Sequence, residues 1–331
     1  MHLPIPDHGG PDGGPEAAHD FSTNASPLGP PPALMSAVQR ADRQAYPDPA
    51  YGALRRRLGV AHEMDPELIL PTAGGAEGIR RLTLAALLMG RREVWVPQPG
   101  FGDYAAAAQA LGLAVRPYAD IARIRPAAPA LVWICEPCNP TGTSLSAWPG
   151  LGDEHLLAVD RAYEPLRLTG NAPALPPGAW QLVCPNKALG LAGVRAGYLI
   201  APARDAAWFN AQALAPSWVL SAEGVAMLTH WHDAATADWL DDARAQLREW
   251  TAAQRRMLEA LDWTDQRPSC TPFWLARPPR PDIALRLRER GIRVRDAASF
   301  GLPGWVRVSA QPRRSQDALQ QALLEIESED S

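Results

Sequence analysis

One lysine in a run of small and apolar residues is the first sign of chemistry in this sequence. Cys184–Tyr198 reads CPNKALGLAGVRAGY, with Lys187 near its start and Arg195 further along. Burying an ammonium group is costly unless it is paired or neutralised. An enzyme that needs an amine nucleophile uses such a lysine with its pKa lowered by burial and nearby cations, as for Schiff-base chemistry. The plain alternative is a surface lysine.

A glycine-rich turn forms a second candidate element. The segment PTAGGAEG (71–78) lies between a strand-like run and a helix-like run. Free backbone N–H groups and the helix dipole make such a turn suitable for an anion, although it could also be only a tight turn. The segment matches neither a P-loop nor a complete dinucleotide-binding fingerprint. It also lacks the acidic residue that such a fingerprint needs about 20 positions further on, which argues against a nicotinamide-dependent dehydrogenase.

Polar residues follow two apolar runs at the points where each run ends. Asn139 stands in EPCNPTGT and could donate a hydrogen bond to a phenolate-type oxygen, or simply start a turn. Asp160 ends the apolar run in LLAVDRAY, and a carboxylate there is costly unless it meets a cation such as a protonated pyridine nitrogen. Tyr163 could reach the same ligand, and the alternative is a capping aspartate beside a half-buried tyrosine.

The elements that must position these residues alternate along the chain. Apolar, strand-like runs occupy 68–72, 93–100, 131–137, 156–163, 181–186 and 196–202, with helix-like segments between several of them. Such runs predict a parallel or mixed sheet covered on both faces. Ligands of such sheets bind at the carboxyl ends of the strands, which is where Asn139 and Asp160 stand.

The pattern changes after about Pro216. Residues 222–261 have helical spacing, and strands are predicted at 271–278, 292–297 and 305–310 before a final helix. The first 30 residues are rich in Gly, Pro and Asp and predict an extended arm, and a helix is expected at Pro32–Arg43. We predict a large α/β domain at 30–225 and a smaller α+β unit formed by 1–29 and 226–331.

Composition narrows the class of protein. The 331 residues carry a net charge of −4, which does not favour nucleic acid or an acidic membrane as partner. No apolar run is long enough to cross a bilayer, and the N-terminus lacks signal-peptide features, so we expect a cytoplasmic protein. Cys135 and Cys138 form a C-x-x-C without a second pair, and we predict a strand end there and no metal site.

Taken in order, these motifs resemble the fold-type I pyridoxal-phosphate enzymes of the class I/II aminotransferase superfamily. The glycine turn, NPTG, D-x-A-Y and K-x-x-G-L-A-G-x-R-x-G-Y occur in the family's sequence order across nearly the whole chain. The resemblance implies that family's fold, a large mixed-sheet α/β/α domain with a smaller α+β domain. It also implies pyridoxal 5'-phosphate as cofactor and a homodimer with shared active sites.

The resemblance assigns a role to each matching residue. Lys187 would bind the cofactor covalently, Asp160 would pair with the pyridine nitrogen, and Asn139 and Tyr163 would hydrogen-bond the ring oxygen. The phosphate would be held by Arg195 and the start of the helix at Gly75, Ala76 and Glu77. In PQPGFGDY, Tyr104 would stack on the ring, and Tyr46 would reach the partner subunit's cofactor phosphate.

Two relatives within the superfamily are similar to this chain: histidinol-phosphate aminotransferase and L-threonine-O-3-phosphate decarboxylase of cobalamin synthesis. HGG at His8–Gly10 and DFSTNASPLGPPP at Asp20–Pro32 favour the decarboxylase. Arg295 and Arg307 match two arginines that hold the acidic groups of the substrate in both families. Asn24 would line the same pocket, and His8 is a further candidate.

We therefore expect a decarboxylase of a phosphorylated amino acid, with an aminotransferase for histidinol phosphate or a similar amine as the alternative. A non-catalytic binding protein of the same fold is a third hypothesis, disfavoured by the joint presence of Lys187, Asp160 and Arg195. The family's D-E-A-Y is D-R-A-Y here, with Arg161, and Cys184 replaces a usual hydroxyl. These departures leave the substrate more open than the cofactor.

Overall fold

A seven-stranded sheet forms the centre of the computed structural model, which describes residues 9–11 and 13–329. The sheet has the order β2-β8-β7-β6-β5-β3-β4, and only β8 runs antiparallel to its neighbours. The strands are β2 (Ile69–Thr72), β3 (Glu93–Pro97), β4 (Ala114–Tyr118), β5 (Leu131–Cys135), β6 (Leu156–Asp160), β7 (Trp180–Val183) and β8 (Gly197–Ile200). The predicted mixed sheet is therefore present.

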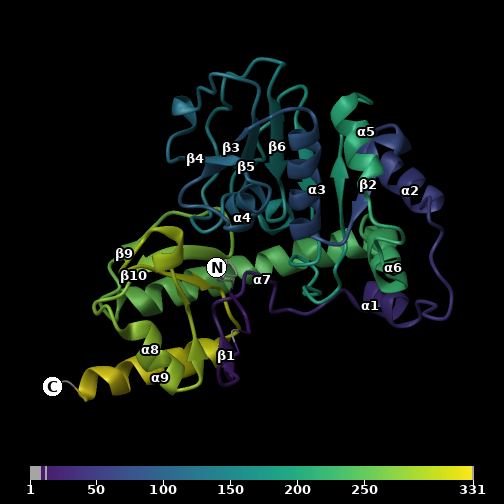
Figure 1. Cartoon of the computed structure of the whole chain (residues 1–331). Helices are drawn as coiled ribbons and strands as arrows, with labels where there is room; N and C mark the ends of the chain where they lie inside the picture. The colour runs from purple at the N-terminus through teal and green to yellow at the C-terminus, as the bar shows by residue number, and fades with distance from the viewer. Residues whose placement is uncertain (1–8, 12, 330–331) are drawn as a thin grey trace.

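The central strands are buried on both faces, as their uninterrupted apolar character predicts. Every residue of β5 and β6 is buried. Trp133 and Cys135 of β5 face the main core, whereas Val132 and Ile134 belong to a separate cluster on the opposite face. Three helices pack together in front of the sheet in Figure 1: α3 (Gly75–Leu88), α4 (Asp103–Ala110) and α5 (Ala206–Ala213). The second face is packed by loop side chains such as Leu145 and Trp148.

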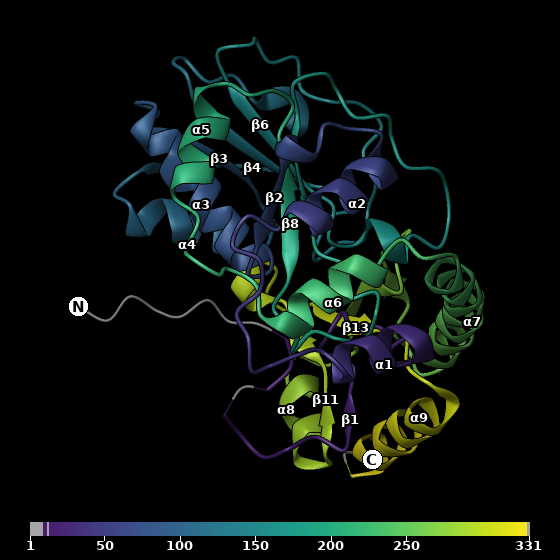
Figure 2. The ribbon, with the colours of Figure 1, turned by 90° about the vertical axis from the view of Figure 1, so that its right-hand side faces the viewer.

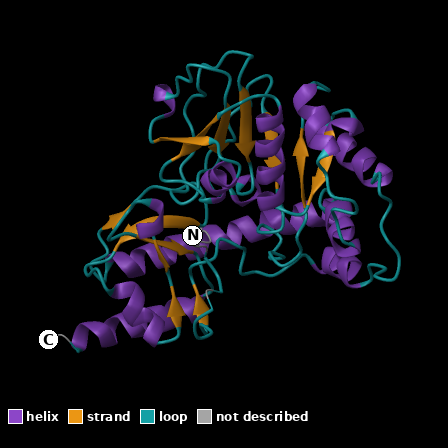
Figure 3. Ribbon diagram, in the orientation of Figure 1, coloured by secondary structure: helices purple, strands orange, loops and turns teal. Residues whose placement is uncertain are grey.

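A smaller antiparallel sheet lies below the large one (Figures 1 and 3). Its order is β12-β13-β10-β9. The strands are β9 (Asp265–Gln266), β10 (Phe273–Arg277), β12 (Arg295–Asp296) and β13 (Val306–Ser309), and helices α8 (Ile283–Glu289) and α9 (Arg313–Ser328) accompany them. The long helix α7 (Ala234–Glu259) packs against α9, and Figure 2 shows it along one side of the molecule.

The N-terminal arm lies on the C-terminal unit rather than on the large sheet. β1 (His19–Asp20) pairs in parallel with β11 (Ile292–Arg293), and Figure 2 shows the two strands side by side. The amide of Ser309 also donates to the carbonyl of Phe21 at 3.0 Å. The arm therefore reaches the same end of the molecule as β13, which carries Arg307.

The element predictions differ from the structure at β4 and α1. The edge strand β4 was missed, because its residues are largely exposed and include Arg116 and Pro117 instead of an apolar run. Helix α1 (Pro32–Gln39) ends before the predicted Arg43. The helical spacing at 222–261 corresponds to two helices, α6 (Ala222–His230) and α7, separated at a turn.

The division into 30–225 and 226–331 stays a prediction, and its boundary falls inside α6. Helix α2 (Gly52–His62) packs beside α6 at the antiparallel edge of the large sheet. Within residues 9–11 and 13–329, no helix combines the length and apolarity needed to cross a membrane. The cytoplasmic location also stays a prediction.

Candidate active site

The carboxyl ends of parallel strands bring the predicted polar residues together. Asn139 follows β5, Asp160 ends β6, and Lys187 lies in the loop after β7. A cavity of about 260 Å³ opens at this edge. Residues predicted for the site that line it are Asn24, Gly75, Ala76, Asn139, Asp160, Tyr163, Lys187, Arg195 and Arg307.

Lys187 is the only lysine in the chain, among 32 lysines and arginines. Its Nζ lies 4.6 Å from the centroid of the Tyr163 ring and 5.9 Å from that of Phe101. Because the sequence contains no other lysine, a Schiff-base role for a lysine side chain can fall only on this residue.

The pKa of Lys187 is raised, contrary to the expectation of a lowered value. Burial lowers this pKa, but the acidic groups of Tyr163, Asp160 and Cys184 together raise it by more. The ammonium form is thus stabilised by the groups that surround it in this cavity.

Asp160 is held by groups from three directions. Its Oδ1 accepts from the amide of Ala162 at 2.9 Å, and its Oδ2 accepts from the hydroxyl of Tyr104 at 2.7 Å. Burial raises the pKa of Asp160, while the charge of Lys187 and the Tyr104 hydrogen bond work in the opposite direction. The carboxylate is therefore kept in position, yet its ionised form depends on these partners.

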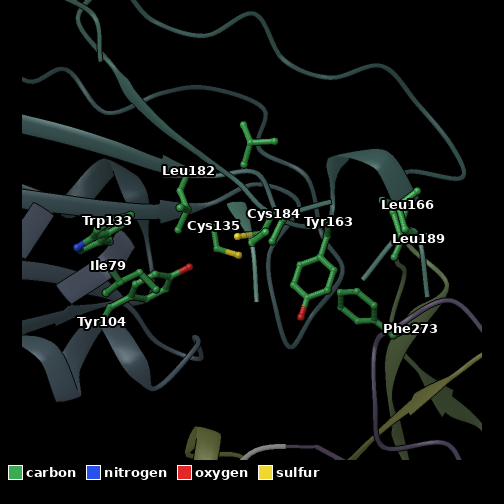
Figure 4. Close-up of a cluster of buried hydrophobic side chains, with 14 of the residues drawn as sticks. Ile79, Tyr104, Trp133, Cys135, Tyr163, Leu166, Leu182, Cys184, Leu189 and Phe273 are labelled. Atoms are coloured by element: carbon green, nitrogen blue, oxygen red, sulfur yellow. The ribbon is translucent and has the colours of Figure 1, made fainter. Parts of the chain in front are cut away.

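Tyr104 does not occupy the place expected for a residue that stacks on a cofactor ring. It is fully buried behind the cavity, and its ring stacks on Trp133 with centroids 5.2 Å apart. Figure 4 shows these two rings lying together, away from Tyr163 and Phe273. Phe101, three residues earlier in the chain, lines the cavity, whereas Tyr104 does not. The motif PQPGFGDY contained both aromatics, and only the start of α4 at Asp103 decides which one faces the site.

The glycine turn has the geometry of an anion cradle. Gly74 has φ of 81°, and a Cβ there would lie 2.8 Å from Nη2 of Arg195. Helix α3 begins at Gly75 without a side-chain cap, so its first N–H groups face the cavity edge where Gly75 and Ala76 lie. The arginine and the helix start are thus close enough to share one anion.

Glu77, also expected near the phosphate, is directed elsewhere. It forms an ion pair with Arg81 and accepts from the amide of Ala73 at 3.2 Å. It lines a different surface depression, beside Arg80 and Leu84, instead of the cavity that holds Lys187. Its position is that of a residue that stabilises the first turn of α3.

The opposite wall of the cavity is basic. Arg307 of β13 donates to Oδ1 of Asn139 and to the carbonyl of Ser22, both at 2.5 Å. Burial lowers the pKa of Arg307 to about 10, helped by Arg295 and opposed by Tyr163 and Asp20. At neutral pH the guanidinium keeps its charge. Asn24 donates to both Asn139 and Tyr163 at 3.3 Å, so the N-terminal arm contributes to this wall.

Two other predicted residues, Arg295 and Tyr46, are not on the cavity wall of this chain. Arg295 is buried and opposite Arg307 in the β12–β13 pair, but it donates to Ser299 at 2.6 Å and lies over Phe300. Tyr46 is 76% exposed and stacks on Trp218 with centroids 4.4 Å apart. His8 lies outside the described residues.

Several residues of the cavity were not predicted for it. Phe300 and Gly9 line the side near Arg307, and Cys184 lies near the glycine turn. Burial raises the pKa of the Cys184 thiol to about 12, so it is a neutral group at physiological pH. A position that often carries a phosphate-binding hydroxyl thus holds a small, weakly polar side chain.

Comparison with known proteins agrees with this geometry. Residues 18–326 match the family model for aminotransferase class I and II. Histidinol-phosphate aminotransferase 1 of Thiobacillus denitrificans is 31% identical, over 92% of this chain and 85% of its own. The corresponding enzyme of Symbiobacterium thermophilum is 30% identical, over 92% of this chain and 91% of its own.

Two solved structures share the fold. Histidinol-phosphate aminotransferase from Sinorhizobium meliloti, in complex with pyridoxal-5'-phosphate, has a TM-score of 0.77 at 25% identity over 95% of this chain and 92% of its own. L-threonine-O-3-phosphate decarboxylase from Porphyromonas gingivalis has a TM-score of 0.79 at 22% identity over 93% of this chain and 99% of its own, which shows the fold alone.

The fold and the site define a fold-type I, pyridoxal-phosphate-dependent enzyme. The chain belongs to the class I and II aminotransferase family. The donor set fits the cofactor: a single lysine, a carboxylate at a strand end, an amide and a phenol, and a glycine cradle next to an arginine. Among the described residues, the buried Oδ1 of Asn24 also lacks a hydrogen-bond partner on this cavity wall.

Because the chain holds a single lysine, the attachment point can be tested directly. We expect borohydride reduction of the holoenzyme to add one cofactor mass to the peptide that contains Lys187. The Lys187→Ala variant should lose both this label and turnover. Label on the N-terminal amine alone, or activity retained without Lys187, would contradict the assignment.

Removing the Tyr104 hydroxyl should alter the pH dependence of the enzyme. Since that hydroxyl lowers the pKa of Asp160, Tyr104→Phe should raise it further. If turnover requires ionised Asp160, activity is lost as the pH falls through this pKa, so the acidic limb of kcat/KM should move to higher pH. Tyr118→Phe, which removes a hydrogen bond to the Trp133 carbonyl, is the control and should leave the limb in place. An unmoved limb in Tyr104→Phe would show that the contact does not act on Asp160.

Proposed function

We propose that this chain is an aminotransferase for a phosphorylated amino compound of the histidinol-phosphate type. The buried Arg307, in the cavity that also holds Lys187, carries the proposal, because it offers a fixed cation to an acidic group of the substrate. Relatives at 30–31% identity over 92% of the chain are histidinol-phosphate aminotransferases. They support this function over the decarboxylase that the N-terminal motifs favoured.

In this proposal the cofactor is held as the family resemblance implies. Lys187 binds it covalently, Asp160 faces its ring nitrogen, and Asn139 and Tyr163 contact its ring oxygen. Phe101 takes the stacking position that was expected for Tyr104. Arg195 and the N–H groups of Gly75 and Ala76 hold its phosphate. When bound, the cofactor supplies the electron sink for the bond broken at the substrate Cα.

The protein residues would choose which bond breaks. Arg307 would hold the substrate carboxylate on its side of the cavity and so leave the Cα–H bond as the one that breaks. The amine of Lys187 would then take the Cα proton and return it at the next stage. The raised pKa of Lys187 means that this amine has to lose its own proton first, and loss of the negative charge of Asp160 would make that easier.

Decarboxylation of L-threonine O-3-phosphate is the second candidate, and a specific observation favours it. The N-terminal arm closes over Arg307: Gly9 and Thr23 line the cavity, and Ser22 accepts a hydrogen bond from this arginine. An arm placed there could orient the substrate so that the bond from Cα to its carboxylate, in place of Cα–H, is the one that breaks. The Porphyromonas gingivalis decarboxylase shares the fold over 93% of the chain.

A product assay separates the two candidates. We expect the holoenzyme to form glutamate from 2-oxoglutarate when histidinol phosphate is supplied, because the relatives at 30–31% identity are histidinol-phosphate aminotransferases. L-threonine O-3-phosphate alone should release no CO₂. Release of CO₂ with aminopropanol phosphate, and no glutamate, would establish the decarboxylase instead.

Arg307 should contribute to substrate binding more than to cofactor binding. Loss of a hydrogen bond to a charged group costs about 1.5–3 kcal/mol, so Arg307→Gln should lower kcat/KM by roughly 10- to 150-fold, mostly through KM. Arg313→Gln, an exposed arginine paired with Asp317, is the control and should change little. An unchanged KM in Arg307→Gln would remove Arg307 from the substrate site.

We propose that the active unit is a homodimer in which Tyr46 reaches the partner subunit's cofactor phosphate. The exposed Tyr46 ring, stacked on Trp218, is available for this contact. Tyr46→Phe should speed the loss of cofactor during dialysis, measured by absorbance, while Tyr118→Phe should not. Equal retention in Tyr46→Phe would mean that its hydroxyl does not contact the cofactor.

A further inference from the structure

A second cavity lies behind the active site, on the other side of the same two strands. It has a volume of about 390 Å³, which is within the range of small-molecule sites. Its walls come from the end of α2, the turn between α6 and α7, the first part of α7 and the ends of β6 and β7. Figure 2 shows α2 and α6 next to each other on this side of the molecule.

Strand alternation places the two cavities back to back. Asp160 and Cys184 line the active cavity, whereas their chain neighbours Arg161 and Val183 line the second cavity. Successive side chains of a strand point to opposite faces, so this arrangement follows from the chain path. Arg161 is also the residue that distinguishes D-R-A-Y here from the D-E-A-Y of the family resemblance.

The charged side chains of this cavity differ in their partners. Asp241 pairs with Arg244, and Glu164 pairs with Arg167, which also pairs with Glu136. Arg161 instead donates to the neutral Oε1 of Gln181 at 2.9 Å, and no ion pair within 9–11 and 13–329 includes it. A guanidinium with spare donors therefore faces the cavity.

Two histidines in the same cavity are held as neutral groups. Burial lowers the pKa of His62 to about 4, aided by the positive charges of His232 and Arg161. Burial and the charge of Arg57 lower the pKa of His232, whereas the charge of Asp233 raises it by less. Nε2 of His62 lies 2.7 Å from the Tyr198 hydroxyl, and Nε2 of His232 lies 3.4 Å from it. Among the described residues, Arg161 is thus a cation of this cavity without an ion-pair partner, and two of its neighbours are neutral rings.

The remaining walls suit a flat apolar group. The ring centroids of Trp231 and His232 lie 5.3 Å apart, and those of His232 and His62 lie 5.0 Å apart at a steep angle. Leu240 and Val183 add aliphatic surface. An aromatic ring can pack among such side chains, while a carboxylate on it can accept two hydrogen bonds from one guanidinium.

We propose that this cavity is a second ligand site that binds a small aromatic carboxylate, with its carboxylate on Arg161 and its ring against Trp231. The site is separate from the cofactor cavity and does not depend on which reaction that cavity catalyses. Because β6 and β7 carry residues of both cavities, a ligand bound here contacts the segments that hold Asp160 and lead to Lys187.

Calorimetric titration of the holoenzyme with benzoate tests the proposal. We expect Arg161→Gln to weaken benzoate binding at least 10-fold, because the charged contact is lost. Arg204→Gln, an exposed arginine paired with Asp65, should leave the affinity unchanged. Benzamide, which has the same ring without the charge, should bind at least 10-fold more weakly than benzoate.

Two further variants keep the test decisive. Leu240→Phe should fill the cavity from α7 and exclude benzoate without altering any charge. Arg307→Gln removes the cation of the active cavity and should leave benzoate affinity unchanged. Loss of binding in Arg307→Gln with unchanged binding in Arg161→Gln and Leu240→Phe would place benzoate in the active cavity and overturn the proposal. Absence of benzoate binding to the unaltered holoenzyme would overturn it as well.

Discussion

The arrangement of this site depends on keeping a charged carboxylate at the buried end of a central strand. β6 has neighbours on both sides and is buried throughout, so Asp160 is removed from water and its ionised form is disfavoured. The Tyr104 hydroxyl, the Ala162 amide and the charge of Lys187 offset this cost. The stack of Tyr104 on Trp133 ties the contact to the core of the large sheet (Figure 4).

A second constraint joins parts of the chain that are distant in sequence. Arg307 belongs to the small sheet, yet its guanidinium bonds Asn139 at the end of β5 and Ser22 in the N-terminal arm. A buried guanidinium is stable only when its donors are used, so these contacts also fix how the three segments meet. A substrate anion that reaches Arg307 would compete for those donors. Substrate choice is therefore linked to the position of the arm.

Strand alternation gives the ends of β6 and β7 two roles. One set of side chains faces the cofactor cavity, and the adjacent set faces the cavity of Arg161, His62 and Trp231. The strand ends are rigid because they are paired on both sides. The two cavities thus share the same backbone segments as parts of their walls.

The sequence by itself determined the sheet, the residues at its strand ends and the family, because apolar runs, a lone lysine and glycine spacing are local patterns. The tertiary structure decided what depends on direction and on distant partners. The start of α4 directs Phe101 rather than Tyr104 to the cavity, and Arg81 draws Glu77 away from it. The pKa of Lys187 is raised because acidic groups from other segments surround it. Such effects fall off steeply with distance, so they are settled only when folding brings those groups together.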